Sequence, residues 1–128
     1  MTHTFTIPGR LPGLNEVTNA NRTHWAAGAK QKKLFTEGIA WVLREQARHL
    51  TKPIDAAWYT FFWHCANKRR DPDNVASACK FVMDALQAAG IIRNDGWDEV
   101  VSITHLFAVD KANPRLELKI QEVTNDGL

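Results

Sequence analysis

The chain has 128 residues, a length that suits one domain and leaves little room for two. Hydrophobic residues make up 45% and charged residues 23%, which is an ordinary globular composition and argues against disorder. The formal net charge is only +2, and two cysteines are too few for a disulfide scaffold or a four-thiolate zinc site. No apolar run approaches the roughly 20 residues of a membrane span, and the first residues lack the layout of a signal peptide. We therefore expect a cytoplasmic protein without a membrane partner.

The small net charge hides a separation of charge along the chain. From Arg22 to Arg70 there are ten basic and three acidic residues, whereas from Asp71 onward there are five basic and ten acidic residues. This separation favours a region that faces a polyanion, next to a cluster of carboxylates. The alternative is two solvated faces of an ordinary protein.

The first half of the chain predicts a strand, a helix and a second strand. Residues 3–7 alternate Thr with apolar side chains and indicate a short strand. From about residue 23 to residue 50 the apolar side chains follow helical spacing, on a stripe of Phe35, Ile39, Val42, Leu43 and Leu50. Residues 56–65 are almost continuously apolar, as expected for a central strand covered on both faces. We therefore interpret its aromatic residues as core: Trp58, Phe61, Phe62 and Trp63.

The second half predicts one more helix and two strands. The helix spans residues 74–89, with Asp73 or Asn74 as its N-cap and Gly90 just beyond its end. Residues 99–109 and 115–123 read as strands, and the Asn113-Pro114 turn between them predicts an antiparallel hairpin. Residues 124–128 are expected to fray. The predicted fold is a single α+β domain over residues 1–128, a mixed sheet of about four strands with two main helices packed on it, in the order β-α-β-α-β-β.

Two aspartates stand directly before the second helix. Asp71 and Asp73 flank Pro72, and a residue that precedes proline is held extended. Two carboxylates at this spacing can converge on one Mg²⁺, which prefers oxygen ligands and takes only a few from protein. Asp95, in the turn after the helix, would complete the site if the fold returns that turn to the loop. The alternative is a turn followed by a helix cap.

A lysine lies on the polar face of the same helix. Positions 73, 77, 80, 84 and 87 recur at intervals of three and four residues, which places Lys80 on the same face as Asp73 and Asp84. Lys80 can reach toward a phosphate bound near the start of the helix. The alternative is an ordinary ion pair between Lys80 and Asp84.

These residues resemble those of the RusA-type Holliday junction resolvases, especially the phage and prophage members. The resemblance rests on Arg70-Asp71-Pro72-Asp73-Asn74, Lys80, Asp84-Ala85-Leu86, Ala89-Gly90 and Asn94-Asp95-Gly96, and more loosely on residues 11–15. It implies a Mg²⁺-dependent crossover junction endodeoxyribonuclease that resolves four-way DNA junctions by paired nicks in recombination and repair. By position it implies Asp71, Asp73 and Asp95 as catalytic metal ligands and Lys80 as the assisting lysine. Lys80 comes three residues later than in the best-known members, a shift of about one helical turn.

The resemblance also implies a homodimer with one active site in each subunit, which suits a junction with two equivalent strands to nick. DNA would lie on the basic segment, where we name as candidate contacts Arg22, Lys30, Lys32, Lys33, Lys68, Arg69 and Arg70. Two other classes of function stay open. One is a non-catalytic, dimeric protein that binds DNA junctions or single strands, and the other is a small structural protein with no salt-dependent affinity for DNA.

Overall fold

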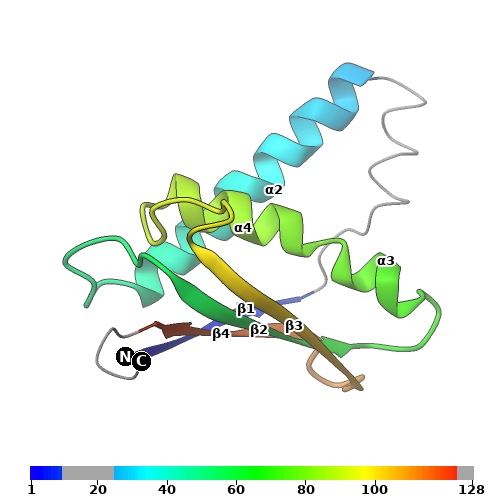
Figure 1. Ribbon diagram of the computed structural model, residues 1–128. Coiled ribbons are helices and arrows are strands. Elements are labelled where there is room, and N and C mark those ends of the chain that lie inside the picture. The colour runs from blue at the N-terminus through cyan, green and yellow to red at the C-terminus, as the bar shows by residue number, and fades with distance from the viewer. Residues whose placement is uncertain (10–24, 124–128) are drawn as a thin grey trace.

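The described helices all lie on one face of a four-stranded sheet (Figure 1). The computed structural model describes residues 1–9 and 25–123, with the backbone alone for residues 25–32, 34 and 35. The strands are β1 (Thr2–Pro8), β2 (Ala57–Cys65), β3 (Val100–Val109) and β4 (Arg115–Glu122), and the helices are α2 (Trp25–Gln46), α3 (Pro72–Ala76) and α4 (Cys79–Ala88). The strand order is β1-β4-β2-β3, with β2 and β3 parallel and the other pairs antiparallel. The predicted mixed sheet with two main helices, α2 and α4, is therefore confirmed.

Strand β4 has the clearest alternation in the sequence and holds an inner position in the sheet. Leu116, Leu118 and Ile120 are at most 1% exposed. The strand pairs with β1 on one side and β2 on the other, for example Leu118 with Phe5 and with Phe61. Side chains of a strand alternate between the two faces, so the period of two in the sequence was sufficient to identify its buried face.

The predicted hairpin between the last two strands is wrong. Strand β3 lies on the far side of β2 and runs parallel to it, so that β2 separates β3 from β4. The connection crosses the end of β2, where the Asp110 N–H donates to the Cys65 carbonyl at 2.8 Å. An inner strand has neighbours on both sides, and this position goes to β2, the most continuously apolar strand of the chain.

Strand β2 is covered on one face, not on both as its sequence predicted. Tyr59, Phe61 and Trp63 are buried beneath the helices, whereas Trp58 on the opposite face is 38% exposed. Phe62 also lies on that opposite face and is half-buried. The interpretation as core therefore holds for Phe61 and Trp63 but not for Trp58, because no described helix packs on the second face.

Helix α2 contributes two buried positions of its predicted stripe, Ile39 and Leu43. It ends at Gln46, earlier than predicted, and a turn leads on to Leu50. Residues 23–24 and the Phe35 side chain lie outside the described part of the chain, as do residues 10–22 and 124–128. Among the described helices, α2 included, none combines the length and the apolar character that a membrane span requires.

The helix predicted over residues 74–89 is two helices. Helix α3 begins at Pro72 and ends at Ala76, and a turn at Ser77 and Ala78, which both keep helical φ and ψ, leads into α4. The bonds across the break, from Lys80 N–H to the Ser77 carbonyl at 3.4 Å and from Phe81 N–H to the Ala78 carbonyl at 3.1 Å, span three residues, as in a 3₁₀ turn. Hydrophobic spacing did not reveal the break, because Val75 and Val82 are buried on either side of it.

The end of α4 agrees with the sequence. Gly90 has φ of +73°, a conformation that residues with a Cβ rarely adopt. Its N–H donates to the Gln87 carbonyl at 3.1 Å, and the Ile91 N–H donates to the Leu86 carbonyl at 2.9 Å. This pair of bonds is a Schellman motif, which turns the chain back toward the sheet.

Candidate functional site

Lys80 is the centre of a cluster of charged side chains above the sheet. Its Nζ lies 3.0 Å from Oδ1 of Asp84, one turn further along α4. It also lies 3.7 Å from Oδ2 of Asp95, in the loop that follows the helix. The fold therefore brings together two of the predicted catalytic residues, Lys80 and Asp95, and it forms the predicted pair of Lys80 with Asp84.

Backbone bonds hold the loop of Asp95 beside α4. Ile54, just before β2, forms a parallel bridge with Ile92. The Ile54 N–H donates to the Ile91 carbonyl at 2.7 Å, and the Arg93 N–H donates to the Ile54 carbonyl at 2.9 Å. Ile54 and Ile92 are both buried. The residues directly before Asp95 are thus anchored to the core, and this anchoring positions Asp95 near Lys80.

The two carboxylates keep Lys80 protonated. The hydrogen bond to Asp84, the charge of Asp84 and a smaller effect of Asp95 raise the pKa of the Lys80 ammonium. The Lys80 side chain is 64% exposed, so an anionic group from solvent can approach it. At neutral pH Lys80 is therefore a cation that can offset negative charge on a phosphate, and it is poorly suited to act as a base.

Asp71 and Asp73 lie at the exposed start of α3. Asp71 is the N-cap residue, with the extended φ and ψ of −68° and 152° that Pro72 favours. Its carbonyl accepts the Val75 N–H at 3.1 Å, while its side chain makes no capping hydrogen bond. The Asp73 carboxylate accepts the Asn74 N–H at 2.9 Å. Both carboxylates face solvent at the entrance to the helix.

The break between α3 and α4 separates these aspartates from the lysine. The sequence placed Asp73 and Lys80 on one continuous helix, and this prediction is wrong, because Asp73 lies in α3, which ends at Ala76, and Lys80 lies in α4, which begins at Cys79. In residues 1–9 and 25–123, no three His, Cys, Asp or Glu side chains gather closely enough to hold a metal ion. The described residues thus give Asp71, Asp73 and Asp95 no common metal position. Mg²⁺ remains a prediction of the sequence.

Sequence reasoning missed two buried groups beside the cluster. Tyr59 is 0% exposed, and its hydroxyl has no hydrogen-bond partner among the described residues. Burial, with smaller effects of the charges of Asp95 and Glu99, raises the Tyr59 pKa to about 12. Glu99 is 5% exposed, and its carboxylate is 2.9 Å from the Arg93 guanidinium. Tyr59 lies within an apolar run, so nothing in the sequence marked it as a neighbour of Asp95.

The structure describes only some of the candidate DNA contacts. Arg22 and the side chains of Lys30 and Lys32 lie outside the described residues. Lys33 is exposed, with Nζ 4.0 Å from Oε1 of Glu37. Lys68 and Arg69 are exposed and Arg70 is half-buried, all in the loop between β2 and α3. The last three therefore form a basic segment directly before Asp71.

Comparison with known proteins does not assign the chain to a family. No protein-family model matches its sequence, and no curated protein resembles it closely enough to count as a match. The functional argument therefore depends on the residues themselves.

Proposed function

We propose that this chain is a Mg²⁺-dependent, structure-selective DNA endonuclease that resolves four-way junctions, and that it works as a homodimer. The observation that carries the proposal is the contact between Lys80 and Asp95, whose nearest charged atoms are 3.7 Å apart. Lys80 belongs to α4 and Asp95 to the loop after it, and the resemblance to RusA-type resolvases names both as catalytic residues. A resemblance in sequence that arose by chance would give no reason for these two side chains to lie in contact.

The charges around this contact support chemistry on a phosphodiester. Asp84 and Asp95 fix the position of the Lys80 ammonium, and their negative charge keeps it protonated. A preorganised cation of this kind stabilises the charge that develops on a phosphate during hydrolysis. We assign no Mg²⁺ ligand from the geometry, because Asp95 faces Lys80 and no described group of three carboxylates is present.

The two edges of the sheet differ in a way that supports a homodimer. On β1, the Gln46 side chain accepts the Thr6 N–H at 2.8 Å and donates to the Thr6 carbonyl at 2.7 Å, which covers part of that edge. Strand β3, at the other edge, is ten residues long and contains no Asp, Glu, Lys, Arg or Pro, the residue types that usually protect an edge. Its exposed apolar side chains are Val101, Ile103, Leu106, Phe107 and Val109.

A second copy of β3 is a suitable partner for this edge. Antiparallel pairing of the strand with itself around a two-fold axis would satisfy backbone groups on both copies. Such pairing would bring no like charges together, since the strand carries none. It would also cover apolar side chains that a monomer leaves exposed. We therefore propose β3 as the dimer contact.

A non-catalytic DNA-binding protein is the second candidate function. Asp71 and Asp73 both take part in the local structure at the start of α3, the first as its N-cap residue and the second by accepting the Asn74 N–H. Asp71 does so through its backbone carbonyl and Asp73 through its carboxylate, and neither role needs a metal. This function predicts junction binding without any cleavage.

Cleavage of a labelled synthetic four-way junction, with Mg²⁺ and with EDTA, separates the two candidates. We expect symmetric nicks in Mg²⁺ only, and none from Asp95→Asn. The matched control is Asp98→Asn, which removes the same charge from an exposed residue of the same loop and should cleave normally. Junction binding without cleavage by the wild type would favour the second candidate. Equal cleavage by both variants would show that Asp95 is misassigned.

A further inference from the structure

A cavity of about 290 Å³ lies at the end of β2, away from the cluster around Lys80. Its walls come from the end of β2, the loop after it, α3 and the start of β4. Val75 lines the cavity, and its N–H donates to the Asp71 carbonyl at 3.1 Å. The cavity therefore adjoins the predicted catalytic loop.

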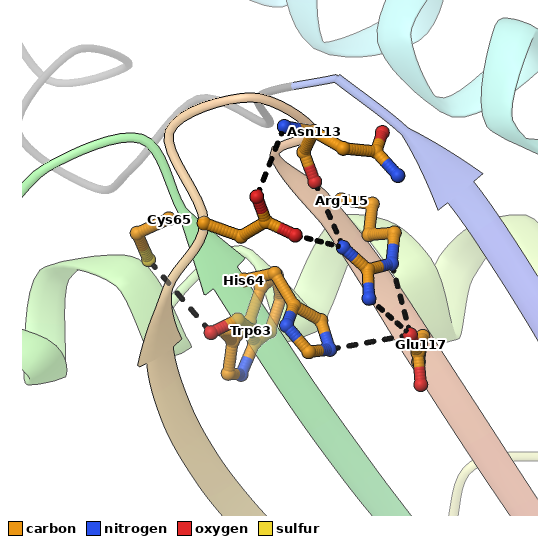
Figure 2. A network of polar contacts seen from close by, with 7 residues as sticks. Trp63, His64, Cys65, Asn113, Arg115 and Glu117 are labelled. Atoms are coloured by element: carbon orange, nitrogen blue, oxygen red, sulfur yellow. Dashed lines mark hydrogen bonds and ion pairs between the residues drawn. The ribbon is translucent and has the colours of Figure 1, made fainter.

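Three arginines line this cavity, and none of its described lining residues is acidic. Arg115 is held from outside the cavity, where its guanidinium lies 2.8 Å from carboxylate oxygens of both Asp110 and Glu117 (Figure 2). It also donates to the Asn113 carbonyl at 2.9 Å. Two carboxylates thus offset the charge of Arg115, and the exposed Arg69 is the lining arginine that can offer its charge to a ligand.

The remaining walls contain apolar surface. Trp63, Val75 and Leu116 all contribute to the lining. Cavities that bind small ligands combine apolar walls with a few polar groups, and 290 Å³ is near the lower end of their usual size. The cavity thus suits a ligand with one anionic group and one apolar part, about as large as a single nucleotide.

We propose that the cavity receives one unpaired nucleotide of a branched DNA strand, with its phosphate at Arg69 and its base against the apolar wall. This inference rests on the proposed function, because it assigns a substrate contact to the same enzyme. Taking a base out of a duplex costs stacking and pairing energy, and the cost is smallest where the base is already unpaired. A cavity of this kind would therefore favour DNA at a branch point over linear duplex.

The test measures binding in EDTA, so that it does not depend on cleavage. The probes are two fluorescein-labelled four-way junctions, one with a single unpaired thymidine at the branch point and one with an abasic nucleotide in its place. We expect the wild type to bind the first about tenfold more tightly, a typical effect of stacking one base. Equal affinity for the two junctions would overturn the proposal, and so would the absence of binding to either.

Two neighbouring residues provide a matched pair of variants. Arg69→Ala removes a positive charge that lines the cavity, whereas Lys68→Ala removes one from the adjacent exposed residue, which is not part of the lining. Without the phosphate contact of Arg69 the nucleotide is no longer held in the cavity and its base no longer packs on the apolar wall, so we expect Arg69→Ala to abolish the preference for the thymidine junction. Lys68→Ala should keep it, although both variants lower overall affinity at fixed salt. If both variants prefer the thymidine junction over the abasic junction to the same degree, the loop contributes to DNA binding only through its positive charge, and the proposal is overturned.

A competition experiment distinguishes whether the cavity binds a nucleotide within DNA or a free nucleotide. Thymidine monophosphate should compete with the junction only at far higher concentration than unlabelled junction does. If it binds as tightly as the junction, the cavity is a site for free nucleotides and the DNA assignment is wrong. If the protein prefers the thymidine junction but never cleaves DNA, the proposed nuclease activity is wrong and the assignment of the cavity stands. The experiment therefore distinguishes failure of the nuclease proposal from failure of the cavity proposal.

Discussion

The ammonium nitrogen of Lys80 lies 3.7 Å from Oδ2 of Asp95, although the first residue belongs to α4 and the second to the loop beyond that helix. Asp84 also contacts the same ammonium, with its Oδ1 at 3.0 Å. A lysine between two carboxylates is held in place and remains charged. This arrangement makes Lys80 the residue on which cleavage should depend most directly.

Replacing Lys80 by methionine should leave junction binding in EDTA nearly unchanged and reduce the cleavage rate by about 10²- to 10³-fold, the usual effect of removing one preorganised group that stabilises the transition state. Single-turnover cleavage of a labelled junction measures this loss. Lys119→Met, on an exposed position of β4, is the control and should cleave at the wild-type rate. Normal cleavage by Lys80→Met would remove Lys80 from the mechanism.

The pH dependence of cleavage should reflect the raised pKa of Lys80. Because the hydrogen bond and charge of Asp84 favour the protonated ammonium, Lys80 loses its proton at higher pH than an ordinary lysine does. Asp84→Asn should lower the Lys80 pKa and so move the alkaline limb of the pH–rate profile to lower pH. Rates measured across the alkaline range check this, and an unchanged limb would mean that another group controls it.

The same pKa shift links Lys80 to stability. A group whose pKa is raised on folding stabilises the folded state below its unfolded pKa, and this contribution is lost as pH rises through the folded value. We therefore expect the wild type to be more stable than Asp84→Asn at neutral pH, with the difference shrinking in strongly alkaline solution. Urea denaturation at several pH values measures it. A difference that grows with pH would contradict the sign of the shift.

Replacing Tyr59 by phenylalanine should leave the free energy of unfolding unchanged or raise it. The Tyr59 hydroxyl is buried and lacks a hydrogen-bond partner among the described residues, so its removal abolishes a desolvation cost. Tyr59→Ala, by contrast, should cost about 3–5 kcal/mol, as is typical when a large buried ring is removed. Chemical denaturation measures both. A loss above about 1 kcal/mol in Tyr59→Phe would reveal a hydrogen bond to that hydroxyl.

A lysine in place of Ile103 should prevent formation of the proposed dimer and leave a monomer. Ile103 is 42% exposed on β3, and two copies would place like charges close together in an antiparallel pair. Light scattering after size-exclusion chromatography measures the molecular mass. Thr4→Lys introduces the same charge on β1, the opposite edge strand, and should leave the dimer intact. A monomeric wild type would refute β3 as the dimer contact.

The local sequence pattern was sufficient to predict the structure where a residue's environment depends on its neighbours in the chain. The alternation along β4 identified Leu116, Leu118 and Ile120 as buried, and Gly90 marked the end of α4. The same reasoning failed at Ser77 and Ala78, where helical spacing continues across a break in the helix. It also failed for Trp58, since an apolar run does not say how many faces of a strand are covered.

The sequence by itself determined the element types, most of their buried faces and the pairing of Lys80 with Asp84, because these depend on contacts within a few residues along the chain. Only the tertiary structure decided that β2 separates β3 from β4, that Asp95 reaches Lys80, and that the charge of Asp95 acts on the buried Tyr59. These residues are far apart in sequence. Which of them come into contact depends on how the apolar faces of the sheet and of the helices pack together over the whole chain.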